Sequence, residues 1–278
     1  MAESSPRPSS LINTIYGAFL RRLGGWSSVA DLILLMEELG VEGSAVRSAI
    51  SRLKKRGVLE SDRRGVTGYL LSPAVHEVFD EGDRRIFGSL EPADLADGWV
   101  MAVFSVPESE RSRRYQLRTR LAWLGFGNVA SGVWIAPGRL MDDAQRLLIR
   151  LGLSDYVHLF RADYAAFDDL RSRVGQWWDV KAIQDQYAEF TETYAPVADA
   201  PRAQGTPLDG AASFRTYVPM LTLWRRLPYM DPGLPRELIP DDWNASAARE
   251  VFQRLHALLA EPSLAHVRRI TGLSPTGV

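Results

Sequence analysis

The sequence predicts an α+β fold of several domains, because three different patterns follow one another along its 278 residues. The first part combines helical periodicity with two short β-type runs, the second alternates strands and helices, and the third is helical almost throughout. The 278 residues exceed one average domain, and 46% apolar residues suffice to bury a core. We therefore expect a winged helix-turn-helix, a ferredoxin-like βαββαβ middle domain and a helical C-terminal domain.

The first part is predicted to contain three helices followed by a hairpin. Each helix has an apolar stripe that ends at glycine, and Ser44 is the expected N-cap of the third helix, which Gly57 ends. The two β-type runs alternate around Gly65 and Gly68, as in a hairpin. The expected elements are helices over residues 11–23, 27–40 and 44–56 and a hairpin over residues 58–72.

The middle part alternates strand and helix patterns in the order βαββαβ. Its two central strands meet at Ser131 and Gly132, and a basic helix follows its first strand. This order is that of the split βαβ arrangement. The expected elements are strands within 99–106, 128–137 and 156–162 and helices over 111–124 and 141–151.

The last part is predicted to be helical, with two connections rich in proline. Helical periodicity covers residues 167–194, 213–227 and 244–260, and small residues between the first two indicate an exposed loop. The second connection, residues 228–243, contains prolines that exclude a continuous helix. Its large apolar residues favour a rigid packed segment, with Leu238 and Trp243 in the core and Asp242 or Asn244 capping the last helix.

Composition excludes several classes of protein. The chain has no cysteine, which excludes disulfides and thiolate chemistry, and its four histidines lack the spacing of a zinc motif. The first ten residues lack the apolar run of a secretory signal, and no aliphatic run approaches the roughly 20 residues of a membrane span. We expect a cytoplasmic protein without a membrane partner, catalytic residues, metal or cofactor.

The third helix and the hairpin carry the main candidate site. Residues 44–64 contain seven basic residues against two acids, a local charge of +5 in a chain whose net charge is −1. Such an asymmetry attracts phosphate, and one helix face is apolar while the other carries side chains that can contact base edges. A solvated amphipathic helix beside an unrelated hairpin is the alternative. The candidate DNA-binding residues are Ser44, Arg47, Ser48, Ser51, Arg52, Lys54, Lys55, Arg63 and Arg64.

Other motifs are weaker. Arg111, Arg114 and Arg118 share one helix face and could bind an anion, although a solvated face is the favoured interpretation. Residues 125–130 match a dinucleotide-binding fingerprint, but a helix precedes them and a strand follows, the reverse of what that fold needs. Adjacent aspartate pairs lie mainly where helices begin, and no nucleophile elbow or phosphate loop is present.

Aromatic residues are frequent in the last part of the chain, where Trp224 precedes two arginines. An aromatic pocket with arginines at its entrance would suit a ligand with a flat apolar part and an anionic part. Core packing explains the same residues equally well. The candidate ligand-binding residues are Trp178, Trp224, Arg225 and Arg226.

Four segments resemble the PaaX-like transcriptional regulators, the family of the phenylacetic acid degradation repressor. Residues 14–20 resemble the family's first helix, 45–72 its recognition helix and wing, and 99–137 its central domain. Residues 223–252 resemble its C-terminal signature, Asp-Pro-x-Leu-Pro-x-Glu-Leu-Leu-Pro-x-x-Trp, which is the most specific of the four. The resemblance covers nearly the whole chain in the same order.

The resemblance implies a dimeric repressor of an aromatic or phenylacetate-type catabolic operon, released from double-stranded operator DNA by an acyl-coenzyme A such as phenylacetyl-coenzyme A. It also implies that the middle domain is similar to CRISPR-adaptation nucleases. Those enzymes hold metal with an aspartate at the end of their first strand, where this chain has Ser105, so nuclease activity is not expected. A metal-dependent nuclease and an effector-independent DNA-binding protein are the alternatives.

The expected boundaries follow from these patterns and the resemblance together. They are a disordered N-terminus over residues 1–9, a DNA-binding domain over 10–95, a ferredoxin-like domain over 96–163, a helical domain over 164–265 and a tail over 266–278.

Overall fold

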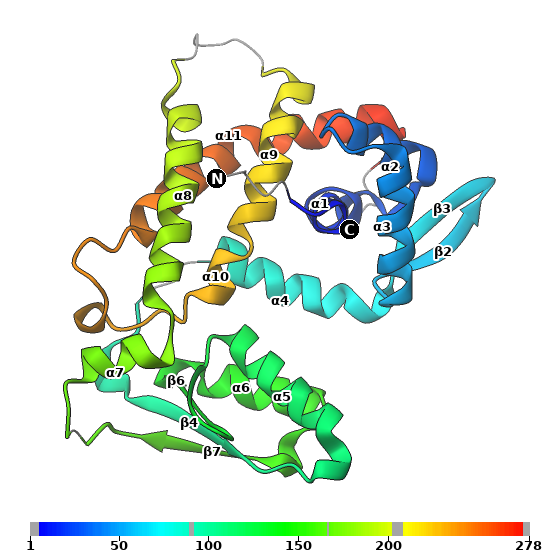
Figure 1. The fold of residues 1–278 in the computed structure, drawn as a ribbon. Helices are drawn as coiled ribbons and strands as arrows, with labels where there is room; N and C mark the ends of the chain where they lie inside the picture. The colour runs from blue at the N-terminus through cyan, green and yellow to red at the C-terminus, as the bar shows by residue number, and fades with distance from the viewer. Residues whose placement is uncertain (1–5, 89–91, 166, 202–207, 275–278) are drawn as a thin grey trace. The chain divides into compact units, whose positions relative to one another are not determined.

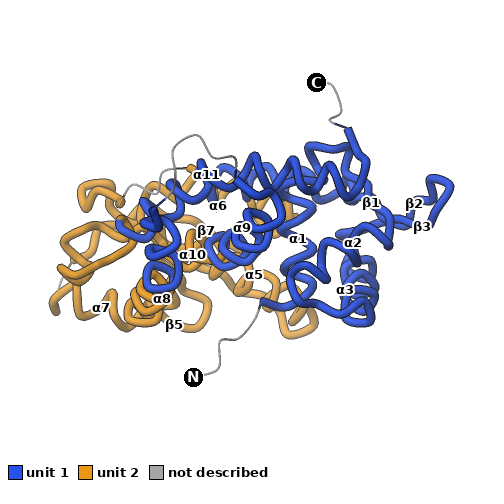
Figure 2. The backbone as a smooth tube through the Cα atoms, turned by 90° about the horizontal axis from the view of Figure 1, so that it is seen from above, with its two compact units in different colours: residues 1–87, 190–225, 247–278 blue, residues 88–189, 226–246 orange. Residues whose placement is uncertain are grey.

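The computed structural model describes residues 6–88, 92–165, 167–201 and 208–274, and the chain forms two compact units (Figures 1 and 2). Unit 1 contains residues 1–87, 190–225 and 247–278, and unit 2 contains residues 88–189 and 226–246. Residues of the C-terminal part therefore belong to both units. The chain passes from one unit to the other several times.

The N-terminal part of unit 1 places three helices against a small antiparallel sheet. Strand order in the sheet is β1-β3-β2, and Trp26 of β1 pairs with Leu70 of β3. The first helix is tied to this sheet by the Tyr16 hydroxyl, which donates to the carbonyl of Tyr69 at 2.9 Å. The elements are α1 (Pro8–Ala18), β1 (Trp26–Ser28), α2 (Val29–Glu37), α3 (Gly43–Lys55), β2 (Leu59–Arg64), β3 (Val66–Leu71) and α4 (His76–Phe87).

C-terminal helices complete the core of unit 1. They are α9 (Gly210–Trp224), α11 (Ala245–Thr271) and the second half of α8 (Val180–Asp199). Phe19, at the end of α1, is 1% exposed and lies between the rings of Phe214 and Tyr217 of α9. Inside the same interface, the hydroxyls of Thr14 and Thr222 lie 2.7 Å apart. The N-terminal elements and these helices therefore share one core.

Unit 2 contains the element order predicted from the sequence, β-α-β-β-α-β. Its antiparallel sheet has the strand order β5-β6-β4-β7, and apolar side chains from the sheet and from its two helices form one core. The succession of strand and helix patterns along this part of the sequence is why this order could be predicted. The elements are β4 (Trp99–Phe104), α5 (Arg111–Leu124), β5 (Gly127–Ala130), β6 (Val133–Pro137), α6 (Met141–Arg150), β7 (Val157–Ala162), α7 (Leu170–Trp177) and α10 (Leu227–Met230).

Short 3-10 helices connect or extend these elements. They cover Leu20–Leu23, Pro73–Val75, Leu95–Asp97, Glu108–Glu110, Gly138–Leu140, Ser154–Tyr156 and Arg236–Leu238.

The proline-rich connection after α9 packs into unit 2 as a rigid segment. The Asp231 carboxylate is buried, accepting from the Gly233 amide at 2.7 Å and the Tyr187 hydroxyl at 3.0 Å. The Arg139 guanidinium donates to the Pro232 carbonyl at 2.9 Å. Leu238 is 7% exposed in this core, as predicted. Asn244 does not cap α11, because its Oδ1 is buried without a hydrogen-bond partner among the described residues.

Several predicted boundaries were wrong where proline was involved. Helix α1 begins at Pro8, inside the terminus expected to be disordered over residues 1–9, because proline is well suited to a first helical turn. Residues 1–5 lie outside the described residues. Helix α11 continues through Pro262 to Thr271, so the expected tail over 266–278 begins within a helix, and Val267 is fully buried.

Two other helices also differ from the prediction. The helical pattern over residues 167–194 is two helices, because Asp179 interrupts it and accepts a hydrogen bond from the Ala182 amide at 3.0 Å. The second helix begins at Val29 rather than at residue 27, since Ser27 and Ser28 belong to β1.

In the part of the chain that the structure describes, no helix is both long and apolar enough to cross a membrane.

Candidate nucleic-acid interface

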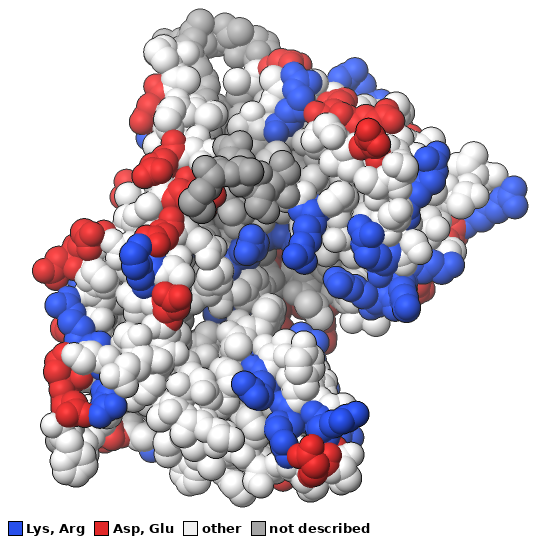
Figure 3. Space-filling model, in the orientation of Figure 1, with Lys and Arg blue, Asp and Glu red and all other residues white. Residues whose placement is uncertain are grey.

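Helix α3 has one buried face and one charged face. Val46, Ala49, Ile50 and Leu53 recur at helical spacing and are at most 2% exposed. The side chains between them point to solvent, and Figure 3 shows Lys and Arg gathered over this helix. The exposed residues include all predicted helix positions, which are Ser44, Arg47, Ser48, Ser51, Arg52, Lys54 and Lys55, and also Arg56, which was not predicted.

The turn between α2 and α3 is tight and glycine-dependent. Gly40 adopts φ +75°, and its amide donates to the Glu37 carbonyl at 2.9 Å. Ser44 is not the N-cap that was predicted, because α3 begins one residue earlier, at Gly43. Glu42 occupies the N-cap position and makes no side-chain capping bond. Ser44 therefore lies within the first turn, where its hydroxyl remains exposed.

The hairpin presents two arginines beside its turn. Gly65 adopts φ +75°, and the register pairs Arg63 with Thr67 and Arg64 with Val66. Both arginines are exposed. No ion pair of Arg63 occurs among the described residues, so its guanidinium is available to an anion.

Arg64 is held in place by neighbouring side chains. Its Nε donates to the Asp62 carboxylate at 3.0 Å, and its guanidinium lies 5.3 Å from the centre of the Trp26 ring. The Trp26 indole in turn donates to the Asp62 carbonyl at 3.1 Å. This contact orders Arg64 along the hairpin. The only hint of this contact in the sequence is Trp26, an isolated tryptophan before the second helix.

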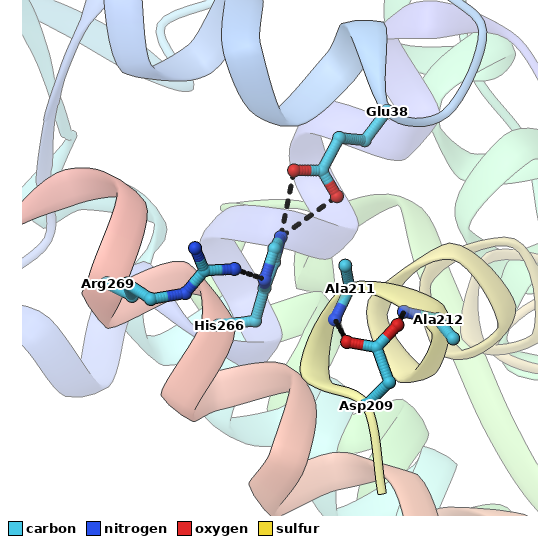
Figure 4. Close-up of polar contacts among 6 residues, drawn as sticks. All are labelled: Glu38, Asp209, Ala211, Ala212, His266 and Arg269. Carbon is cyan, nitrogen blue, oxygen red and sulfur yellow. Dashed lines mark hydrogen bonds and ion pairs between the residues drawn. The ribbon is translucent and has the colours of Figure 1, made fainter.

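A buried histidine connects the end of α2 with α11 (Figure 4). The His266 side chain is 1% exposed, and its Nε2 lies 2.9 Å from both carboxylate oxygens of Glu38. Arg269 donates to His266 Nδ1 at 2.8 Å, so Nδ1 is the acceptor and Nε2 carries the proton that is donated to Glu38. The helix that precedes α3 is thereby anchored to the C-terminal part of the chain.

The first turn of α9 lies beside this cluster. The Asp209 carboxylate accepts from the amides of Ala211 at 3.2 Å and Ala212 at 3.0 Å, as Figure 4 shows. These backbone hydrogen bonds, first that of Ala212, lower the pKa of Asp209. Asp209 therefore stays ionised and stabilises the start of the helix that supports α1.

The predicted ligand-binding tryptophans serve the cores of the two units. Trp178 is 7% exposed in unit 2, and its indole donates to the Gly125 carbonyl at 2.9 Å. Trp224 is fully buried in unit 1, where it stacks on Phe252 and donates to the Ile86 carbonyl at 3.0 Å. Both indole N–H groups therefore donate within their own unit, and the assignment of these tryptophans to a ligand stays a prediction.

The two predicted arginines differ from each other. Arg225 is half-buried and donates to the Ser10 carbonyl at 3.3 Å, whereas Arg226 is exposed. The sequence could not separate packing from ligand contact, because both use aromatic residues beside arginines.

The end of the first strand of unit 2 carries serine rather than a carboxylate. Ser105 follows β4 and is exposed, where the nuclease comparison would require an aspartate. Within the described ranges, no group of three or more His, Cys, Asp or Glu side chains is placed to bind a metal ion.

Three family models match successive parts of the chain. A PaaX-like protein model matches residues 7–75, the PaaX protein central Cas2-like domain matches 92–174, and the PaaX-like protein C-terminal domain matches 178–269. The chain belongs to the PaaX-like family. It is therefore an α+β protein with an N-terminal PaaX domain, a Cas2-like middle domain and a helical C-terminal domain.

Comparisons with single proteins give one PaaX relative, one transferase match and one solved structure. The chain is 28% identical to the transcriptional repressor PaaX of Escherichia coli over 264 residues, which cover 93% of this chain and 82% of the relative. A 28% identical match to an aspartate/glutamate leucyltransferase of Rhodopseudomonas palustris covers 52% of each chain. Among solved structures, the uncharacterized protein Rv0674 of Mycobacterium tuberculosis has the same fold, with a TM-score of 0.55, 21% identity and coverage of 94% of this chain and 99% of that chain.

Proposed function

We propose that this PaaX-like protein is a DNA-binding transcriptional regulator that acts as a repressor in the cytoplasm, and not an enzyme. The exposed basic face of α3, next to a hairpin that carries Arg63 and Arg64, is the observation that supports this most. An E. coli relative is a transcriptional repressor. In this proposal the N-terminal part is a winged helix-turn-helix, with α3 as recognition helix and the hairpin as wing.

Two classes of contact are assigned to the site. Arg47, Ser48, Ser51 and Arg52 contact base edges in the major groove, and Ser44 contacts the backbone near the helix start. Lys54, Lys55, Arg63 and Arg64 contact phosphates or the minor groove. A homodimer would place two such surfaces on a pseudo-palindrome whose half-sites lie about 10 bp apart or a multiple of that spacing.

Arg47→Ala tests the base-contact assignment. We expect it to weaken specific operator binding by about 1–3 kcal/mol and to relax specificity, as measured by gel-shift titration. Arg215→Ala is the matched control, because Arg215 is an exposed arginine on α9 of the same unit. Equal operator affinity of Arg47→Ala and the native protein would refute the assignment.

The effector part of the proposal is an acyl-coenzyme A, such as phenylacetyl-coenzyme A, that releases the regulator from an aromatic catabolic operon. Such a ligand must bind the conformation that cannot bind DNA more tightly than the conformation that can. A ligand with equal affinity for the two conformations would not shift the equilibrium between them. A thermal-shift series over acyl-coenzyme A thioesters tests this, because a specific ligand raises the melting temperature. No shift with any thioester would leave a DNA-binding protein without this effector.

A further inference from the structure

Two neighbouring hollows of unit 2 lie beside the first half of α5. One has a volume of ≈ 550 Å³ and the other ≈ 560 Å³, and both are lined by Arg114, Arg118 and Trp134. Arg111 lines only the second hollow, and Asn128 only the first. Helix α5 and strands β4, β5 and β6 thus form the walls of a concave surface.

The charge of these walls is positive. Of the described residues that line the hollows, none is acidic. Arg111 and Arg118 are exposed and form no ion pair with any described residue. Figure 3 shows a group of Lys and Arg side chains over this end of α5. A surface with uncompensated arginines on a concave wall attracts small anions.

Arg114 is partly engaged but can still contribute. It donates to the Val106 carbonyl at 2.7 Å and pairs with Glu108 at 3.0 Å. The Glu108 side chain is 79% exposed, so this ion pair is a weak surface contact that an anion can replace. The bond to the Val106 carbonyl meanwhile fixes the direction of the guanidinium.

Trp134 supplies a second, independent indication of a ligand. It is 7% exposed, and its indole Nε1 is buried with no hydrogen-bond partner among the described residues. Strand β6 lies between β4 and β5, which prevents the backbone from shifting to find an acceptor. The amide of Asn128 already donates to the Ala130 carbonyl at 2.9 Å. A buried donor without an acceptor is unfavourable and often marks an absent ligand or ion.

We propose that these hollows form one site for a small phosphate-bearing molecule, a diphosphate or phosphate ester. Its oxygens would accept from the guanidinium groups of Arg111, Arg114 and Arg118 and from Nε1 of Trp134. A small ligand is favoured over duplex DNA, because hollows of ≈ 550 and ≈ 560 Å³ have the size of small-molecule sites. This site is separate from the DNA contacts assigned to α3, and its binding does not depend on them.

Calorimetry with sodium pyrophosphate and the full-length protein tests this site, with sodium sulfate at equal ionic strength as the competing anion. We expect saturable pyrophosphate binding that Arg118→Gln weakens at least about tenfold, because charge-assisted hydrogen bonds to phosphate are strong. Arg120→Gln is the matched control, since Arg120 is exposed on the same helix but lines neither hollow. Its affinity should match that of the native protein. Trp134→Phe should also weaken binding, since it removes the indole N–H donor while keeping an aromatic ring.

Three outcomes would overturn the proposal. The first is no pyrophosphate binding, or binding that sulfate reproduces, which would leave a hollow that holds only water or exchangeable ions. The second is an equal loss in Arg118→Gln and Arg120→Gln, which would indicate non-specific attraction to helix charge. The third is a loss of operator affinity in Arg118→Gln with pyrophosphate affinity unchanged, which would make this surface a contact for nucleic acid. Loss of operator binding in Arg47→Ala concerns only the α3 assignment and would not change the expected pyrophosphate binding.

Discussion

Gly233 combines a left-handed backbone conformation with a close side-chain neighbour. It adopts φ +64°, and a Cβ placed there would overlap a terminal nitrogen of Arg139. The same guanidinium donates a hydrogen bond to the Pro232 carbonyl. Desolvation lowers the pKa of Arg139, and the negative charge of Asp231 opposes that effect. The glycine of this proline-rich segment is therefore needed both for its backbone conformation and for the arginine beside it.

We expect Gly233→Ala to destabilise the protein by about 2–4 kcal/mol, of which roughly 1 kcal/mol comes from the left-handed backbone. Gly152→Ala is the control, because Gly152 adopts φ +62° in the same unit with nothing within 4 Å of its Cβ position. Denaturant unfolding measures both variants. Equal decreases in the free energy of unfolding would show that the contact with Arg139 does not destabilise Gly233→Ala.

His256 gives the protein a pH-dependent stability. Its Nδ1 lies 2.7 Å from the Tyr217 hydroxyl, and burial, with a smaller effect of Arg22, lowers its pKa against the opposing charge of Glu261. Between that lowered pKa and the unfolded value of about 6.5, the unfolded chain binds more protons. This contribution to stability is therefore complete above about pH 6.5 and decreases as the pH falls.

His256→Gln should reduce the difference between the melting temperatures at about pH 7.5 and about pH 5, because glutamine does not titrate. Differential scanning calorimetry at the two pH values measures it. If the melting temperature decreases by the same amount in the variant and in the native protein on acidification, other groups cause the pH dependence.

At the scale of elements, α3 begins without a side-chain cap. Glu42 has φ −63° and ψ 146°, the conformation of an N-cap, but its side chain accepts no backbone hydrogen bond. Aspartate is among the preferred N-cap residues and keeps the charge. We expect Glu42→Asp to stabilise the protein by about 0.5–1 kcal/mol without changing operator affinity. Urea unfolding and a gel-shift titration measure the two effects, and an unchanged midpoint would contradict the first.

The same helix shows how far sequence alone determined the candidate site. Its two faces follow from residue spacing, so the exposure of Arg47 and Arg52 was predictable. Its first residue was not, because Gly43 and Ser44 both suit a helix start and tertiary contacts decide between them. The predicted end of the last helix, at residue 260, was wrong because α11 continues through Pro262.

Long-range pairs were beyond sequence reasoning. The contact of His266 with Glu38 joins residues 228 positions apart, and no local pattern indicates it. The burial of Trp178 and Trp224 was not predictable from spacing, because burial depends on which surfaces meet in the folded chain. Spacing therefore predicts faces and element order, whereas the partners of those faces require the structure.

At the scale of the whole molecule, the N-terminal elements depend on helices formed much later in the chain. Phe19 and Thr14 are buried against α9, and the Ile86 carbonyl accepts from Trp224. A fragment of residues 6–88 would expose these apolar surfaces to water. We expect it to lack a cooperative thermal transition by circular dichroism, whereas the full chain unfolds cooperatively. A sharp transition of the fragment would show that α9 and α11 are dispensable for its fold.

This chain order has a consequence during synthesis on the ribosome. The described segments of unit 2 end at residue 246, whereas the core of unit 1 includes Val267 near the end of α11. Unit 2 can therefore finish folding while the N-terminal elements of unit 1 still lack their last packing partner. A nascent chain would carry the basic helix α3 long before the ribosome has made α11, which completes the core of the same unit.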